Sequence, residues 1–207
     1  MAEFFGTFCL IFCGTGAIII DQETSGSIGH LGVSITFGLI VSAMIYTFGN
    51  ISGAHLNPSV TLGFTVSGLF PKNRILGYIL AQGMGAIIAS ISLKFLFPHN
   101  ILLGGTYPLN QEWQSFLLET ILSLILMLVI LFTSQGSKET GTMAGLAIGG
   151  VILLEALFAG PISGASMNPI RSLSPELISG NFHSIWIYLT APFLGTIMAS
   201  LVWRFLK

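Results

Sequence analysis

Charged residues are scarce in this chain: its 207 residues include only 7 Lys and Arg and 8 Asp and Glu, for a net charge of −1. Soluble domains carry about 25% charged residues, whereas here the share is 7% against 53% hydrophobic residues, and the mean hydropathy is +0.87. These values exclude an ordinary soluble domain and indicate a protein embedded in the lipid bilayer through several spans. Nucleic-acid binding is also excluded, because no basic patch is present to neutralise phosphates.

Cysteine is nearly absent too. Cys9 and Cys13 are the only two, four positions apart on the first apolar segment, where one helix face would carry both side chains. This pattern excludes a disulfide framework and a metal site made of cysteine, and we expect no metal and no cofactor. The N-terminal segment MAEFFGTF has an acid where a secretory signal has basic residues, so we expect a first span that is retained.

Six stretches are apolar over about the 20 residues that a transmembrane helix needs: 3–20, 31–49, 74–97, 113–133, 141–160 and 182–206. Two further stretches, 57–66 and 168–178, are too short to cross. Cytoplasmic loops of membrane proteins carry an excess of Lys and Arg, which favours cytoplasmic termini. That orientation leaves Lys94 and Arg171 as exceptions and places the other basic residues on the cytoplasmic side, namely Lys72, Arg74, Lys138, Arg204 and Lys207.

The chain contains an internal repeat. The segment SGAHLNPSV (52–60) recurs as SGASMNPIR (163–171), and each copy has an Asn-Pro pair that interrupts an apolar stretch. Duplicated, Pro-interrupted hydrophobic segments point to a transport site built from two half-helices. A second match pairs GYILAQGMGAIIAS (77–90) with IYLTAPFLGTIMAS (187–200), and its small residues at every fourth position allow close helix approach.

The repeat predicts a single channel domain over residues 1–207, with halves 1–97 and 113–207 joined by an outer loop, 98–112. Three spans per half is an odd number, so the second half is expected to lie upside down relative to the first. This inversion would bring the two half-helices toward each other from opposite faces of the membrane.

An Asn-Pro pair has a specific meaning at a helix start. Asparagine is a favoured N-cap and proline is favoured at the first helical position, so Asn57 with Pro58 and Asn168 with Pro169 are expected to begin the half-helices. The NH2 group of each capping amide would then point outward as a donor beside a positive helix end. Two such ends would orient a passing hydroxyl oxygen and disfavour cations, including hydronium. The alternative is an Asn-Pro turn in each of two ordinary loops.

The residues ahead of each pair are expected to run non-helically and to offer acceptors along a water-filled path. The residues expected to line it are Gly53, Ala54, His55, Gly164 and Ser166. Glu3 and Glu119 stand near the start of each half and are expected to accept hydrogen bonds from N–H groups of these loops, since an acid in hydrocarbon has a partner. We expect His30, His99 and His183 to be solvated at the outer surface.

The segments AEFFGTF, ISGAHLNPSV, GYILAQ, LLET and GASMNPIRS make the chain resemble the aquaporin and glycerol-facilitator family over essentially its whole length. The run FAGPISGASMNPIRSLSPELISGNFHSIWIYLTAP most resembles the nodulin-like branch of plants and its bacterial relatives, which is associated with glycerol, water and metalloid hydroxides such as arsenous, boric and silicic acid. The resemblance implies an all-α membrane protein with six transmembrane helices, two re-entrant half-helices in two inverted repeats, and a pore through each subunit of a homotetramer. It also implies a plasma membrane or a bacterial inner membrane as the location.

The family's selectivity filter, carried over by position, falls on Phe37, Ala156, Ala165 and Arg171. Arg171 would donate to a solute oxygen and repel cations; the alternative is an arginine that snorkels to the surface. Water-selective members typically have histidine at the position of Ala156, so this ring is expected to pass a solute wider than water. Ser59 and Ile170 replace the alanine that usually follows each Asn-Pro pair, adding a hydroxyl and bulk beside the expected pore centre.

Glu155, an acid one position before a filter residue, is a candidate for function because intramembrane acids usually have one. It either packs behind the filter and holds loop backbone, or it biases solute choice or makes conductance depend on pH. A proton-coupled transporter that uses Glu155, Glu3 or Glu119 is therefore one alternative.

We find no nucleophile paired with a base, no metal-spaced set and no phosphate loop, so an enzyme is not expected. We favour a passive channel that conducts small uncharged solutes, namely glycerol-like polyols, metalloid hydroxides and water, and that excludes protons and ions. A water-dominated pore is the main alternative.

Overall fold

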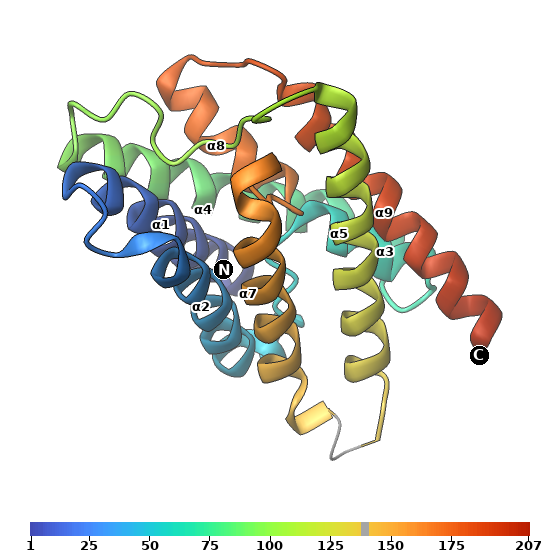
Figure 1. Ribbon diagram of the computed structural model, residues 1–207. Helices are drawn as coiled ribbons and strands as arrows, with labels where there is room; N and C mark the ends of the chain where they lie inside the picture. The colour runs from blue at the N-terminus through green and yellow to red at the C-terminus, as the bar shows by residue number, and fades with distance from the viewer. Residues whose placement is uncertain (138–140) are drawn as a thin grey trace.

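The computed structural model describes residues 1–137 and 141–207, which form helices and connecting loops and contain no strand (Figure 1). Within this part of the chain, six helices are long and apolar enough to cross a membrane. They are α1 (Ala2–Glu23), α2 (Gly29–Ser52), α4 (Ile75–Leu96), α5 (Glu112–Ser134), α7 (Ala144–Ser163) and α9 (Ile185–Leu206). The half-helices are α3 (Pro58–Val66) and α8 (Pro169–Ser179), and a short turn, η1 (Lys72–Arg74), precedes α4.

The predicted all-α fold with six spans and two shorter helices is confirmed. Each predicted stretch agrees with a helix to within a few residues; the fifth span, expected at 141–160, is displaced by three residues because the regular helix α7 begins at Ala144. The basic residue Lys138, expected on the cytoplasmic side, lies outside the described residues.

The bundle has two ends that differ in what they hold. The C-terminal Lys207 Nζ lies 3.4 Å from the carbonyl oxygen of Gln135, and we call this end the terminal face. At the other end, the connection between α4 and α5 meets the end of α1, where Asn100 Nδ2 donates to Gln22 Oε1 at 3.0 Å. We call this end the opposite face; it carries the connections 24–28, 97–111 and 180–184.

Small residues allow two pairs of long helices to touch. A Cβ atom on Gly85 of α4 would lie 2.2 Å from the carbonyl oxygen of Phe4 in α1, and one on Gly195 of α9 would lie 2.2 Å from that of Thr120 in α5. Only glycine permits backbone contact at this distance, which confirms the close approach expected from the duplicated segment.

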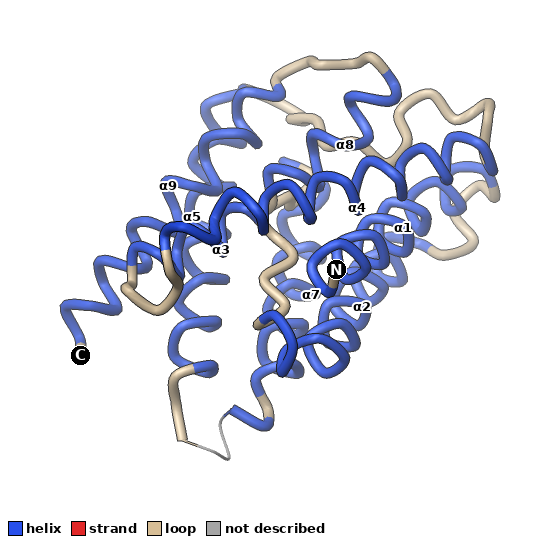
Figure 2. The backbone as a smooth tube through the Cα atoms, turned by 180° about the vertical axis from the view of Figure 1, so that it is seen from behind, coloured by secondary structure: helices blue, strands red, loops and turns tan. Residues whose placement is uncertain are grey.

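The two half-helices occupy the interior between these pairs. α3 packs mainly against α9, and α8 packs mainly against α4 and α9. Figure 2 shows the loop ahead of α3 entering the middle of the bundle rather than staying at its end. The half-helix α3 is thus held mainly by a helix of the other half of the chain, and α8 by one helix from each half; their starts meet in the centre of the fold.

Candidate functional site

Each half-helix begins at an asparagine that caps it. The Asn57 backbone is extended (φ −157°, ψ 123°), and its Oδ1 accepts a hydrogen bond from the N–H of Ser59 at 2.9 Å. Asn168 has nearly the same backbone (φ −145°, ψ 111°), and its Oδ1 accepts from the N–H of Ile170 at 3.1 Å. In both cases a proline follows as the first helical residue, where its missing N–H costs nothing. Both half-helices therefore start with their positive ends toward the centre of the bundle.

The two caps are joined to each other's loops. Asn57 Nδ2 donates to the carbonyl oxygen of Met167 at 2.8 Å, and Asn168 Nδ2 donates to that of Leu56 at 2.9 Å. The sequence predicted an NH2 group that points outward as a donor, and each amide does donate outward, but the acceptor is a backbone carbonyl of the facing loop, which was not predicted. A carboxamide carries two N–H donors, so the second remains for a solute, and both asparagines line the central cavity.

The loop ahead of each asparagine has left-handed backbone at three matching positions. The φ values are 85° at Gly53, 46° at Ala54 and 51° at Leu56, and 83° at Gly164, 42° at Ala165 and 53° at Met167. The glycine in each loop ends the preceding long helix and adopts this conformation without strain. The other residues have a Cβ and pay a conformational cost of about 1 kcal/mol or more each, so other contacts must hold both loops in place.

Glu119 supplies those contacts for the second loop. Its Oε1 accepts from Ser163 Oγ at 2.7 Å and from the N–H of Ser166 at 2.9 Å, while its Oε2 accepts from the N–H of Met167 at 2.8 Å. The side chain is fully buried. A carboxylate that accepts several N–H and O–H groups forms charge-assisted bonds, about twice as strong as neutral ones.

Glu3 makes the corresponding set of contacts with the first loop. Its Oε1 accepts from Ser52 Oγ at 2.7 Å and from the N–H of His55 at 2.9 Å, and its Oε2 accepts from the N–H of Leu56 at 2.8 Å. One partner has no counterpart in the second half: Gln82 Nε2 donates to Glu3 Oε2 at 2.8 Å. Sequence reasoning missed Gln82, although its place in the segment GYILAQ, where the repeat has proline, distinguishes the two halves.

Two tyrosines also brace the loops and were not predicted to do so. Tyr78 Oη donates to the carbonyl oxygen of Ser52 at 2.8 Å, and Tyr188 Oη donates to that of Ser163 at 2.7 Å. The two tyrosines are aligned in the duplicated segments 77–90 and 187–200. That alignment was the signal that could have identified them as partners of the loops.

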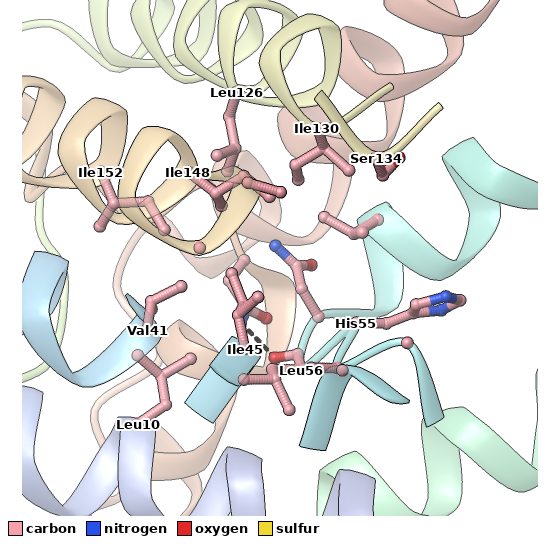
Figure 3. A pocket seen from close by; sticks show the side chains of 18 of the residues that line it. Leu10, Val41, Ile45, His55, Leu56, Leu126, Ile130, Ser134, Ile148 and Ile152 are labelled. Atoms are coloured by element: carbon pink, nitrogen blue, oxygen red, sulfur yellow. Dashed lines mark hydrogen bonds between the residues drawn. The ribbon is translucent and has the colours of Figure 1, made fainter. Parts of the chain in front are cut away.

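A cavity of about 780 Å³ extends from the terminal face past both asparagines to Arg171. One side is apolar and includes Val41, Ile45, Ile148 and Ile152, which Figure 3 shows as sticks around the open space. Polar groups line it as well, and they include Asn57, Asn168, His55, Ser166 and Arg171. The cavity thus has the mixed lining that an uncharged solute with hydroxyl groups requires.

The four predicted filter residues come from four different parts of the fold. Phe37 extends from α2, Ala156 from α7, Ala165 from the loop ahead of α8, and Arg171 from α8 itself, and all four line the cavity. The guanidinium carbon of Arg171 lies 5.1 Å from the centroid of the Phe37 ring, within cation–π range. We call these four residues the ring. Its two alanines contribute only methyl groups, so two of its sides are formed by short side chains.

Arg171 is held in the ring by the connection between α4 and α5. Its side chain is only 3% exposed, and Nη1 donates to the carbonyl oxygen of Gly104 at 2.7 Å. The same connection is tied to α8 by Thr106 Oγ1, which donates to Ser172 Oγ at 2.6 Å. A surface-snorkelling arginine, the alternative from sequence, does not fit this position.

Three of the residues named with the pore are not part of the cavity lining, although Ser59 stays beside the pore asparagine Asn57. Ser59 is fully buried and its Oγ donates to Asn57 Oδ1 at 2.8 Å, so its hydroxyl reinforces the cap and does not face the cavity. Ile170 packs in the hydrophobic core. Gly164 is the C-cap of α7, and a Cβ there would lie 2.8 Å from Thr106. Gly53, Ala54, His55 and Ser166, in contrast, do line the cavity.

Glu155 is buried with 2% exposure, and within the described chain neither of its carboxyl oxygens has a hydrogen-bond partner. The expectation that it holds loop backbone was wrong, because Glu119 takes that place. Glu155 is also not part of the cavity lining. It remains an acid near the ring with no direct route to a solute.

The histidines divide into three kinds. His55 Nδ1 lies 3.1 Å from Thr61 Oγ1, and its ring stacks on Phe64 with centroids 4.6 Å apart. His99 and His183 are exposed, as expected. His30 is exposed too, but it is not simply solvated, because its Nε2 bonds a carbonyl oxygen of α7.

Comparison with known proteins agrees with this geometry. The family model described as major intrinsic protein matches residues 1–203. Aquaporin NIP1-1 of Zea mays is 44% identical over 208 residues, covering the whole of this chain and 74% of the relative, and Aquaporin NIP3-1 of Arabidopsis thaliana is 40% identical over 215 residues, covering the whole chain and 67% of that relative. The aquaglyceroporin of Plasmodium falciparum, a solved structure, superposes with a TM-score of 0.90 at 27% identity and covers 98% of this chain and 93% of its own.

Proposed function

We propose that this chain, which belongs to the major intrinsic protein family and is a membrane channel for water and small neutral solutes rather than an enzyme, conducts glycerol-like polyols and metalloid hydroxides as well as water. Glycerol and arsenous, boric and silicic acids share one chemistry: a small uncharged centre that carries three or more hydroxyl groups. The proposal concerns this chemical class and does not rank its members.

The ring is the observation that carries the proposal. Arg171 contributes one fixed cationic donor and Phe37 one apolar wall, while Ala156 and Ala165 leave the remaining sides open. A solute wider than water fits such a ring if one side of it is apolar and another carries hydroxyl oxygens. A side chain larger than alanine at position 156 would close this space.

A solute would pass along donors that are already in place. At the centre of the cavity it meets the remaining N–H groups of Asn57 and Asn168, and at the ring it meets Arg171. Each of these groups donates to a hydroxyl oxygen, while the carbon skeleton of a polyol, or the open face of a metalloid hydroxide, lies against Val41 and Ile148. Because the donors are held by other bonds, little ordering is needed when the solute arrives.

Cations are excluded by the same arrangement. The positive ends of α3 and α8 both point to the centre of the cavity, and Arg171 adds a full positive charge at the ring. A cation at either point would lose hydration and meet repulsion. We infer that hydronium is rejected for this reason, so the pore carries solutes without a proton current.

The proposed orientation places the terminal face in the cytoplasm of a plasma membrane or a bacterial inner membrane. The connections of the opposite face, 24–28, 97–111 and 180–184, contain no Lys or Arg, whereas Lys72, Arg74, Arg204 and Lys207 belong to the terminal face, as expected for cytoplasmic loops. We further propose a homotetramer with one pore in each subunit. Native mass spectrometry of the detergent-purified protein tests it, and a monomeric or dimeric mass would contradict it.

Stopped-flow light scattering on reconstituted vesicles tests the function. Vesicles with and without the protein are exposed to gradients of water, glycerol, urea and boric acid, and we expect faster shrinking or swelling for water, glycerol and boric acid. If only water crosses faster than in empty vesicles, the protein is the water-dominated alternative. A proton-sensitive dye inside the vesicles measures coupling, and proton uptake that follows the solute would establish a coupled transporter instead.

A further inference from the structure

Helix α7 contains a proline close to the ring. Pro161 lies inside the helix (Ala144–Ser163), and proline has no N–H to donate to the carbonyl four residues before it. The carbonyl that loses its helical partner belongs to Leu157, the residue that directly follows Ala156 of the ring. An unpaired carbonyl in a membrane helix requires a donor from elsewhere.

His30 supplies that donor from the first turn of α2. Its Nε2 lies 2.6 Å from the carbonyl oxygen of Leu157. The neighbouring residue of α7 makes room for the imidazole: a Cβ atom on Gly160 would lie 2.9 Å from His30 Cε1, closer than real Cβ contacts allow. The pair Gly160 and Pro161 therefore both exposes the carbonyl and leaves the space in which the histidine reaches it.

This bond is one end of a contact that runs along α2 and α7. Nearer the terminal face, Ser42 Oγ donates to the carbonyl oxygen of Gly145 at 3.0 Å. In the middle of the contact, a Cβ atom on Gly38 would lie 2.6 Å from the carbonyl oxygen of Gly149. Beyond this point both helices continue to the opposite face, and the bond from His30 ties their ends together there.

The ring stands between the middle of this contact and its end. Phe37 follows His30 by about two helical turns on α2, and Ala156 directly precedes Leu157 on α7. Two walls of the ring are thus carried by the two helix segments that the His30 bond joins at the opposite face. We propose that His30 is a positioning residue that sets the width of the ring, an inference that rests on the proposed solute channel.

The proposed role depends only on the N–H that His30 donates to Leu157. Substitutions that remove or keep a donor at position 30 therefore test it. His30→Phe keeps a ring of similar size but has no donor. His30→Gln retains an N–H donor at nearly the place of Nε2. His99→Phe removes an exposed histidine from the same face and serves as the control.

The experiment measures water, glycerol and erythritol permeability of the full-length protein in vesicles. With His30→Phe we expect the ratio of erythritol to water permeability to rise by about threefold, a change of the size that loss of one fixed hydrogen bond produces. His30→Gln should restore the ratio to within the error of the wild type, and His99→Phe should leave it unchanged. An unchanged ratio in His30→Phe, or an equal loss for all three solutes, would overturn the inference.

Pro161→Ala provides a second test that does not depend on the folding of His30→Phe. Alanine returns an N–H to the helix, so the Leu157 carbonyl bonds within α7 and releases His30. The ratio should rise as in His30→Phe, and the double variant should show no further increase; additive changes, or no change in Pro161→Ala, contradict the proposal. Failure of the wild-type protein to conduct glycerol would refute the proposed function itself, which is a separate result.

Discussion

Replacing Glu119 by glutamine is expected to destabilise the protein more than replacing Glu3 by glutamine. In the described part of the chain, the oxygens of Glu119 accept from Ser163, the last residue of α7, and from Ser166 and Met167 of the loop ahead of α8. A glutamine at this place keeps one acceptor oxygen and presents an NH2 group where the other oxygen stood. If the amide oxygen stays with Ser163 and Ser166, the NH2 faces the N–H of Met167, and two donors then point at each other.

The size of the effect follows from these contacts. A buried donor that loses its acceptor costs about 1–3 kcal/mol, and bonds to a charged acceptor exceed bonds to a neutral one by about 1 kcal/mol. Losing the partner of Met167 and weakening the bonds from Ser163 and Ser166 therefore costs about 3 kcal/mol in total. For a chain of this length that corresponds to a fall of about 6–12 °C in Tm.

Glu3 differs because Gln82 lies beside it. Gln82 Nε2 donates to Glu3 Oε2, and the Oε1 of the same amide is buried without a hydrogen-bond partner in the described structure. If the Gln82 amide turns over, its oxygen accepts from the NH2 group that Glu3→Gln introduces. We therefore expect Glu3→Gln to cost about 1 kcal/mol less than Glu119→Gln.

Thermal unfolding of the purified variants in detergent, followed by tryptophan fluorescence, measures both costs. The double variant Glu3→Gln with Gln82→Ala removes the acceptor and should bring the loss of Tm up to that of Glu119→Gln. Wild type and Gln82→Ala alone are the controls. Equal Tm values for Glu3→Gln and Glu119→Gln, or no contribution from Gln82, would refute the reasoning.

Three further predictions concern the ring, the buried acid and the helix contacts. Ala156→His fills the open side of the ring, so we expect glycerol permeability to fall by about tenfold or more while water permeability is largely kept, as light scattering would show; equal losses for both solutes would contradict a width effect. Glu155→Gln should give the same permeability profile as wild type between about pH 5 and 8, because Glu155 does not line the cavity; a changed profile would give this acid a part in conduction. Gly195→Ala places a Cβ 2.2 Å from the carbonyl oxygen of Thr120 and should lower Tm by several degrees, at about 2–4 °C per kcal/mol, whereas Gly150→Ala, with no atom within 4 Å, should not.

The central features of the site were accessible from sequence because they depend on local chemistry. An Asn-Pro pair is a cap and a helix start wherever it occurs, and its duplication indicated two such starts. The acid near the start of each half was also predicted as a partner of the loops. A carboxyl group in an apolar segment requires donors, and the loops ahead of the caps have N–H groups that no helix pairs. The places of Glu3 and Glu119 in the structure follow from that requirement.

Other parts of the site were missed because their partners come from distant segments with no pattern of their own. The carbonyl of Gly104 that holds Arg171 lies in an irregular connection, and nothing in its composition marks it. Ser59 was expected to add a hydroxyl beside the pore centre, but the bond from this hydroxyl back to Asn57 was not predicted. His30 looked like an ordinary surface histidine, because its contact depends on a carbonyl that Pro161 leaves unpaired in another helix.

The amino-acid sequence by itself determined which segments cross the bilayer and which two are interrupted by capped helix starts, since hydropathy and capping act over neighbouring residues. Only the tertiary structure decided how those starts meet. The amide of Asn57 bonds the carbonyl of Met167, and that of Asn168 bonds the carbonyl of Leu56, so each asparagine divides between joining the halves and lining the cavity. That division depends on the distance between two loops far apart in the chain, which packing of the long helices sets.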